Sequence, residues 1–86
     1  MKIKVKAKEH KKEKAEINTD YIQLQAFLKF MGIAETGGQA KELIQDGIIR
    51  VNGESCTARG KKLRNEDVVS AFSVDYEIVS TVNNEN

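Results

Sequence analysis

The chain begins with an alternation of apolar and basic residues. From Lys2 to Lys8 every second residue is a lysine, and the apolar positions between them are Ile3, Val5 and Ala7. A period of two residues predicts a half-buried β-strand, here with a cationic outer face. Such lysines also protect an exposed sheet edge from aggregation, and the pattern fits both roles. The polar run 9–14 that follows predicts a turn or a mobile loop.

A helical spacing replaces the alternation further along. The apolar residues fall at i, i+3, i+4 and i+7, namely Leu24, Phe27, Leu28 and Met31. This spacing predicts one buried face of a short amphipathic helix, which Gly32 ends.

The segment 17–24, which precedes this helix, carries two conflicting signals. Asp20 followed by Gln23 loosely matches a helix capping box. Tyr21 and Ile22 instead favour an extended chain, and the sequence leaves both conformations open.

A second helix is predicted directly after the first. Thr36 with Gln39 three residues later is the better capping-box match. Lys41 faces solvent in this helix, and Gly47 supplies its left-handed end. The buried stripe is expected to comprise Ala40, Leu43 and Ile44.

The second half of the chain has the spacing of β-strands. Asn52-Gly53 lies between the extended segments 48–51 and 54–58, and this dipeptide is a strong hairpin signal. Two further strands are expected at 68–72 and 76–82, around a turn at 73–75. The predicted fold is therefore α+β: two short helices packed on a small antiparallel sheet, with an N-terminal strand or arm.

The length of 86 residues allows one domain. We expect a lysine-rich N-terminal strand or arm at 1–19, the folded domain at 20–82 and a frayed tail at 83–86. Cys56 is the one cysteine, which excludes an internal disulfide and a multi-cysteine zinc site. No apolar run is long enough to span a bilayer, and the charged N-terminus lacks the apolar region of a signal peptide. A cytoplasmic location without membrane partners is therefore expected.

Charge is distributed unevenly, although the net charge is only +1. Residues 1–14 contain seven lysines, whereas residues 66–86 contain five acidic residues and no lysine or arginine. Between them, the run 59–64 contains four cations in six positions. This asymmetry indicates a polyanionic partner.

Catalytic chemistry has little support in the sequence. His10, the one histidine, lies in the charged N-terminal segment without a recognisable nucleophile or carboxylate pair. The pair Gly37-Gly38 is too short for a nucleotide-binding glycine loop. We therefore expect no enzyme activity, no metal and no small-molecule cofactor.

Anion-binding features form the clearest functional pattern. A helix N-terminus presents unpaired backbone N–H groups and the positive end of its dipole, and glycines there would let a phosphate approach closely. Each feature also has an ordinary explanation. Helix capping accounts for the residues at the helix N-terminus, and a solvated turn accounts for the basic residues that follow later in the chain. The candidate RNA-binding residues are Thr36, Gly37, Gly38 and Lys41 at the helix, with Arg59, Lys61, Lys62 and Arg64 in the predicted basic loop.

The stretch 24–69 resembles the RNA-binding domain named after ribosomal protein S-four. That domain occurs in pseudouridine synthases, tyrosyl-tRNA synthetases and a ribosome-associated heat-shock protein. Its pattern matches this chain at Leu28 to Gly32, Thr36, Ala40, Leu43-Ile44, Gly47, Val51-Asn52-Gly53 and Asp67-Val68.

Within that family the chain looks most similar to the short stand-alone YaaA-like members. These share the Thr/Ser-Gly-Gly-x-Ala-Lys sequence, here 36–41, and the Arg-Gly-Lys-Lys-Leu sequence, here 59–63. In the family the two-helix face and the adjoining loop hold structured RNA. The resemblance implies this role for Thr36, Lys41, Arg59, Lys61 and Lys62.

The chain departs from the family pattern in three places. Many members have arginine where this chain has Gly37, Arg-Leu-Asp where it has the run 23–25, and glycine where it has Glu66. The first two departures remove common RNA contacts, which predicts weaker affinity or a different RNA. The lysine-rich N-terminal arm is a candidate to compensate.

The leading hypothesis is a non-catalytic module that binds structured RNA, ribosomal RNA or tRNA, on the ribosome or a ribosomal precursor. Phosphate contacts and shape would provide recognition, because Phe27, Phe30 and Phe72 are expected in or near the core and leave no aromatic platform for bases. The alternative is a protein-interaction adaptor that uses the acidic C-terminal strands and the sheet edge. A duplex DNA binder has less support, because neither helix resembles a base-reading recognition helix.

Overall fold

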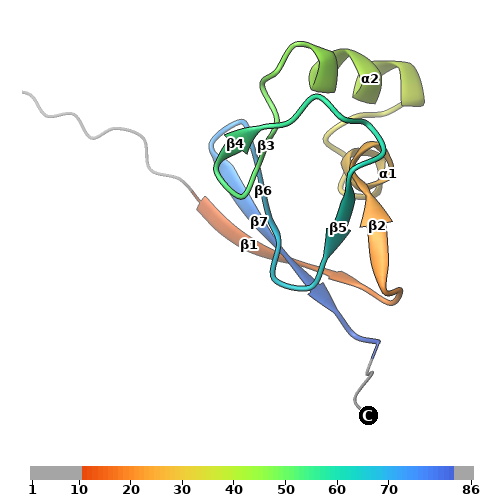
Figure 1. Cartoon of the computed structure of the whole chain (residues 1–86), viewed down its shortest axis with the longest axis vertical. Coiled ribbons are helices and arrows are strands. Elements are labelled where there is room, and N and C mark those ends of the chain that lie inside the picture. The colour runs from red at the N-terminus through yellow and green to blue at the C-terminus, as the bar shows by residue number, and fades with distance from the viewer. Residues whose placement is uncertain (1–10, 83–86) are drawn as a thin grey trace, which may run out of the picture.

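A computed structural model describes residues 11–82, which form the α+β fold predicted from the sequence (Figure 1). The predicted strand at 2–8, His10 and the tail 83–86 lie outside the described residues. The elements, in chain order, are β1 (Lys11–Ile17), β2 (Tyr21–Gln23), α1 (Leu24–Phe30), α2 (Gly37–Gln45), β3 (Arg50–Val51), β4 (Glu54–Ser55), β5 (Lys62–Arg64), β6 (Val68–Ala71) and β7 (Val74–Ser80).

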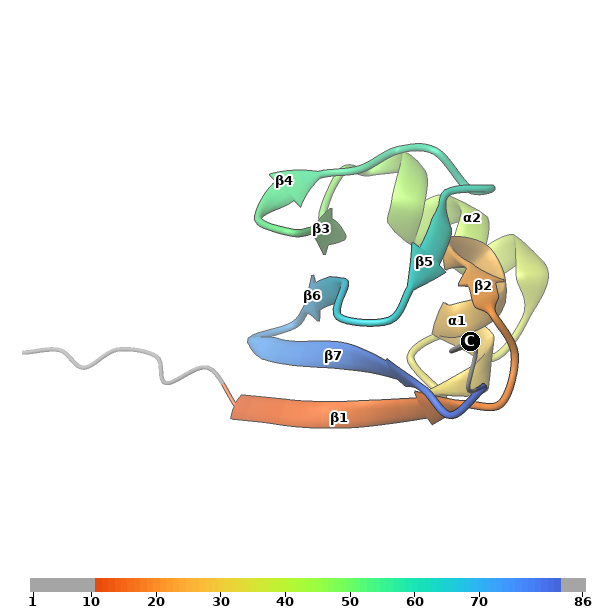
Figure 2. The same cartoon turned by 60° about the horizontal axis from the view of Figure 1, so that its bottom comes forward.

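The main sheet has five strands in the order β1-β7-β6-β3-β4. It is mixed rather than antiparallel throughout, because β1 runs parallel to β7 over its whole length (Figure 2). A parallel pair needs a long connection between its strands, and here nearly the whole domain lies between them. A second sheet, which we call the β2–β5 ribbon, consists of those two strands in antiparallel pairing.

Strand β1 corrects, at residues 11–14, the expectation of a loop over 9–14. Its first residues are polar, yet they pair with β7, and Lys11 N–H donates to Ser73 O at 3.0 Å. Ala15 and Ile17, at the other end of β1, are buried in the core. Pairing with a distant strand therefore overrides the loop preference of the charged run.

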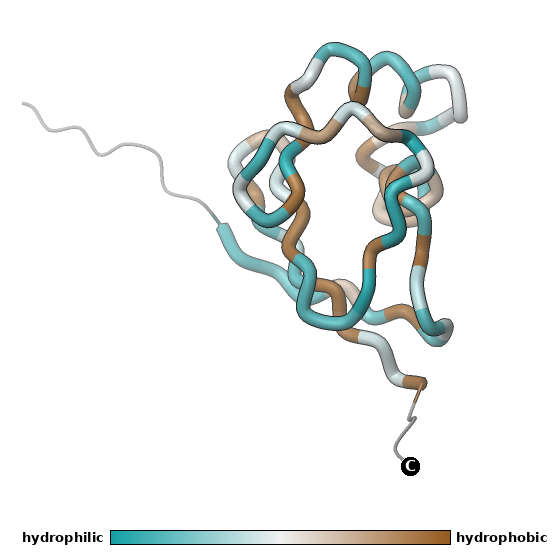
Figure 3. Tube along the Cα trace, viewed as in Figure 1, coloured by the Kyte–Doolittle hydropathy of each residue, from teal (hydrophilic) through white to brown (hydrophobic). Residues whose placement is uncertain are grey.

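In the described part of the chain, the two helices, the main sheet and the β2–β5 ribbon enclose one hydrophobic core. The predicted α1 face is confirmed at its three buried residues, and in α2 Ala40 and Ile44 are buried while Leu43 is half-buried. Figure 3 shows the apolar positions distributed over both the helices and the strands. The buried set comprises Leu24, Phe27, Leu28, Ala34, Ile49, Val51, Leu63, Val69, Ala71 and Ile78 besides those already named.

The helix ends follow local chemistry. Gln39 N–H donates to Thr36 Oγ1 at 3.0 Å, and Gln39 Oε1 accepts from Glu35 N–H at 2.6 Å. Gly32 and Gly47 both have φ of +76°, as left-handed ends require. These features confirm the predicted second cap and the two glycine ends.

Two turns connect adjacent strands with positive φ angles. Asn52 (φ +53°) and Gly53 (φ +88°) form the predicted β3–β4 hairpin. The β6–β7 turn lies at Phe72 (φ +51°) and Ser73 (φ +69°) instead of 73–75. Phe72 has no turn-forming character, so the sequence pattern misses it. The side chain is 64% exposed, which corrects its expected near-core position.

Side-chain hydrogen bonds join the β3–β4 hairpin to the turn after β5. Asn52 Nδ2 donates to Asp67 Oδ1 at 3.1 Å, and Val68 N–H donates to Asn52 Oδ1 at 2.9 Å. Asp67 Oδ2 also accepts from Arg64 N–H at 2.8 Å. The Asn and Asp of the sequence pattern therefore fix the end of β5, which belongs to the basic segment.

Candidate nucleic-acid interface

The basic run 59–64, called the basic segment below, begins with a turn that is hydrogen-bonded to the start of α1. Lys61 N–H donates to Ala58 O at 3.1 Å, which closes the turn. Leu24 N–H then donates to Lys61 O at 2.8 Å and Gln25 N–H to Arg59 O at 3.1 Å. These carbonyls satisfy N–H groups that a helix N-terminus leaves unpaired. Loop carbonyls thus replace the capping box considered at Asp20, since the N-cap is Gln23 without a side-chain bond.

The second half of the basic segment is strand β5 rather than a loop. Ile22 pairs with Leu63, which is fully buried, so the alternate residues of both strands point outward. Lys62 and Arg64 are among these exposed side chains. The β2–β5 ribbon therefore presents cations on its outer face.

Lys61 points to a different side of the ribbon. Its side chain lines a pocket of about 340 Å³ together with residues of the β3–β4 hairpin, including Glu54 and Cys56. Lys61 and Lys62 are neighbours in sequence but serve different surfaces.

The other group of candidate residues lies at the N-terminus of α2. Thr36, Gly37, Gly38 and Lys41 are all exposed there. Within the described part of the chain, neither glycine N–H donates to an acceptor. The space that a Cβ at Gly37 would occupy is open. A phosphate could reach this helix end without displacing a side chain.

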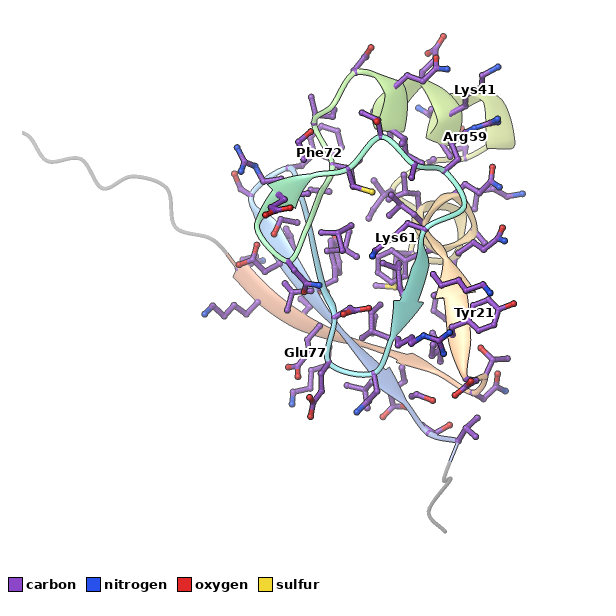
Figure 4. All side chains as sticks on the ribbon, viewed as in Figure 1. Tyr21, Lys41, Arg59, Lys61, Phe72 and Glu77 are labelled. Carbon is purple, nitrogen blue, oxygen red and sulfur yellow. The ribbon has the colours of Figure 1, made fainter. Side chains whose placement is uncertain are left out.

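The two groups lie on neighbouring elements, since Figures 1 and 2 both show the loop before β5 passing alongside α2. Lys41 and Arg59 project on the same flank in Figure 4. No hydrogen bond or ion pair among residues 11–82 joins the two groups. Arg64 is placed apart from them and contacts the Asp20 carboxylate at 3.4 Å.

The acidic residues of β7 are directed to another part of the molecule. Asp75 and Glu77 line a pocket with Lys12 and Lys14 of β1, and Lys14 Nζ is 3.8 Å from the Glu77 carboxylate. In Figures 1 and 2, β1 lies on the side opposite to the basic loop. The basic loop and the N-terminus of α2 are thus separated from the acidic residues of β7.

Two aromatic residues at or near the β2–β5 ribbon are exposed, which was not predicted from the sequence. Tyr21 is 38% exposed, with Lys62 Nζ at 4.9 Å and Arg64 Cζ at 5.4 Å from its ring centroid. Phe30 is 57% exposed, so its expected near-core position was wrong. Its helical position, outside the stripe of buried α1 residues, was the signal available. Aromatic surface is therefore present beside the ribbon, contrary to the expectation of no platform.

The described residues contain neither a membrane-spanning helix nor a metal-binding cluster. Across residues 11–82, no helix is long and apolar enough to cross a bilayer. In the same range, no group of three or more His, Cys, Asp or Glu side chains is arranged to hold a metal ion.

Comparison with known proteins gives a family and a relative. The sequence model of the S4 domain matches residues 15–79. The probable ribosome maturation protein RlbA of Bacillus subtilis (strain 168) is 40% identical over 53 residues, which cover 62% of this chain and 75% of that protein. The match to the S4 model extends from the buried end of β1 almost to the end of β7, and the chain therefore belongs to the S4 domain family.

Proposed function

We propose that this protein is a non-catalytic module that binds structured RNA, either ribosomal RNA or tRNA, through phosphate contacts and shape. The S4 domain is an RNA-binding domain. The observation that carries the finer proposal is the basic loop, held to the first turn of α1 by two backbone hydrogen bonds and lying alongside α2. These hydrogen bonds hold the backbone of Arg59 and Lys61 in a fixed position relative to α1.

Two kinds of phosphate contact would act together. At α2, the free N–H groups of Gly37 and Gly38 and the positive helix end would bind one phosphate, with Lys41 adding a full charge. At the loop, the Arg59 guanidinium could bind a second phosphate through two N–H groups. Thr36 would act indirectly, by holding the helix end through its bond to Gln39.

Phosphate-binding groups held in fixed positions favour recognition of RNA shape over recognition of RNA sequence. Phosphate contacts position a protein on a nucleic acid but carry no direct information about the bases. A rigid pair of anchors selects RNAs whose backbone brings phosphates to both places. We therefore expect folded RNA to bind more tightly than duplex DNA of similar charge.

The setting that we propose is the ribosome or a ribosomal precursor, in the cytoplasm. The support is the name of the relative, a probable ribosome maturation protein. A protein adaptor acting through the acidic C-terminal strand has less support, because β1 and β6 occupy both edges of β7.

The test is direct binding to a folded ribosomal RNA fragment, a tRNA and a DNA duplex, followed by cosedimentation with ribosomal particles. The proposal predicts submicromolar, salt-sensitive binding that prefers folded RNA. Equal millimolar binding to all three nucleic acids would contradict it and direct attention to protein partners.

A further inference from the structure

We propose that a pocket beside the β2–β5 ribbon binds one unpaired RNA base, stacked against Tyr21 and Phe30, while the adjoining phosphate contacts Lys62. This inference rests on the proposed RNA-binding function and extends it from the phosphate backbone to a base. It names a contact that phosphate and shape recognition alone do not provide.

The pocket lies where the end of β1, the start of β2 and the C-terminal end of α1 meet. Its volume is about 570 Å³, which is within the range of roughly 300–1,000 Å³ common for small-molecule sites. Ile17 and Ile22 provide aliphatic surface, and Asn18 adds an amide that can both donate and accept hydrogen bonds. This combination of apolar and polar lining suits a flat heterocycle with hydrogen-bonding groups.

Two aromatic side chains line this pocket although neither belongs to the core. Tyr21 projects from β2 and Phe30 from the last turn of α1. Single exposed apolar residues are ordinary in proteins. Two aromatic rings at one pocket are a different arrangement, because stacking on such rings is how proteins hold unpaired bases.

The charges around Tyr21 identify the class of ligand. Lys62 and Arg64 both lie against its ring, at 4.9 and 5.4 Å from the centroid. In the described part of the chain Lys62 has no carboxylate partner. Arg64 is shared with Asp20, but both side chains are more than half exposed, and such surface ion pairs contribute little. Cations beside an aromatic pocket complement a nucleotide better than an apolar peptide.

Strand β5 connects the basic loop to Tyr21, which lines the pocket. Strand β5 follows the loop directly, and its Lys62 is diagonally opposite Tyr21 across the ribbon. In Figure 4, Arg59 and Tyr21 lie along the same flank, with the ribbon descending from the loop to Tyr21. Glu16 also lines the pocket, and its carboxylate would repel a phosphate there but not a neutral base. An RNA strand held at the loop could therefore continue past Lys62 and place a base in the pocket.

The test compares two RNAs with the same number of phosphates, a hairpin with an unpaired loop and a fully paired duplex. Tyr21→Ala and Phe30→Ala are each expected to weaken hairpin binding by about 5- to 150-fold, as loss of one base stack does. Duplex affinity and the salt dependence should stay near wild type, because no charge is removed. Tyr21→Phe keeps the ring and should retain hairpin binding.

Phe72→Ala provides the matched control, since Phe72 is 64% exposed at the β6–β7 turn and does not line the pocket. Circular dichroism and urea unfolding verify that each variant is folded. As a second measurement, 4-thiouridine in the hairpin loop should crosslink to the peptide containing Tyr21.

The results separate this inference from the proposed function. If wild type binds RNA but the pocket variants lose no more hairpin affinity than Phe72→Ala, the base pocket is excluded and the phosphate interface stands. Equal losses for hairpin and duplex also exclude it. If wild type binds neither RNA, the proposed function fails and the base pocket fails with it.

Discussion

Glu66 occupies a backbone conformation that favours glycine. Its φ is +79°, and it is the third residue of a turn closed by Asp67 N–H donating to Arg64 O at 3.0 Å. A side chain in this region costs about 1 kcal/mol or more, whereas glycine adopts it freely. Glu66→Gly should therefore raise the free energy of unfolding by up to about 1 kcal/mol in urea titrations. Thr57→Gly, at a position without positive φ, is the control and should lower it.

Asp67 is a structural residue although it belongs to the acidic part of the chain. Its carboxylate accepts hydrogen bonds from Asn52 Nδ2 and Arg64 N–H, which hold the hairpin and β5 together. Asp67→Ala leaves both donors without these acceptors and should cost about 1–3 kcal/mol of unfolding free energy. Glu42→Ala removes an exposed carboxylate from α2 and should change stability by less than about 0.5 kcal/mol. Equal effects of the two substitutions would contradict the assigned role.

Tyr76 should make stability depend on alkaline pH. Partial burial against the core raises the pKa of its phenol above 10.0, and the nearby Glu13 carboxylate raises it further. The folded protein then holds this proton more tightly than the unfolded chain. The contribution of Tyr76 to stability is therefore fully present below about pH 10 and is lost as pH rises through the folded pKa. Tyr76→Phe should reduce this fall in urea midpoints measured between about pH 9 and 11. An unchanged pH dependence would assign the fall to other groups.

Helix α2 offers a way to strengthen RNA binding. Gly37 stands where many S4 domains have arginine, its φ is not positive, and a Cβ there would meet no atom within 4 Å. Gly37→Arg should therefore fold normally, add one phosphate contact and steepen the slope of log affinity against log salt by about one unit. Gly37→Glu places a negative charge at the same point and should weaken binding. Unchanged RNA binding in both variants would exclude the α2 N-terminus from the interface.

The elements also divide into those that local rules predict and those that they do not. The two helices, the Thr36 cap and the Asn52-Gly53 hairpin are determined by residues a few positions apart. By contrast, β1 and β5 are strands because of distant partners, since β1 pairs with β7 and Lys62–Arg64 pairs with Tyr21–Gln23. No local pattern in either charged run reveals these pairings.

The residues of the candidate site could be predicted from the sequence, but their arrangement in space could not. Residue types and spacing identify the cations and the glycines at α2. They do not reveal that Lys61 and Lys62 face different surfaces, because this depends on β5 being a strand whose Leu63 is buried. Nor do they place Tyr21 and Phe30 at one pocket, since these residues meet only after β2 and α1 pack.

For the whole molecule, the separation of charge is more informative than the net value of +1. The basic loop and α2 lie on one side, while the acidic residues of β7 lie beside lysines of β1 on the other. Such an arrangement orients a polyanion towards one surface. Three cations in the loop region and three lysines in β1 therefore form a matched pair for testing where RNA binds.

The most direct test is the affinity for folded RNA over a salt series, with wild type and two triple-alanine variants. One variant replaces Arg59, Lys61 and Lys62, and the other replaces Lys11, Lys12 and Lys14, so both lose the same charge. If about four to six phosphates are neutralised, the wild-type slope of log affinity against log salt is roughly −3 to −5. The loop variant should flatten this slope by about two to three units, while the β1 variant stays close to wild type. Equal slopes for the two variants would contradict an RNA interface at the basic loop.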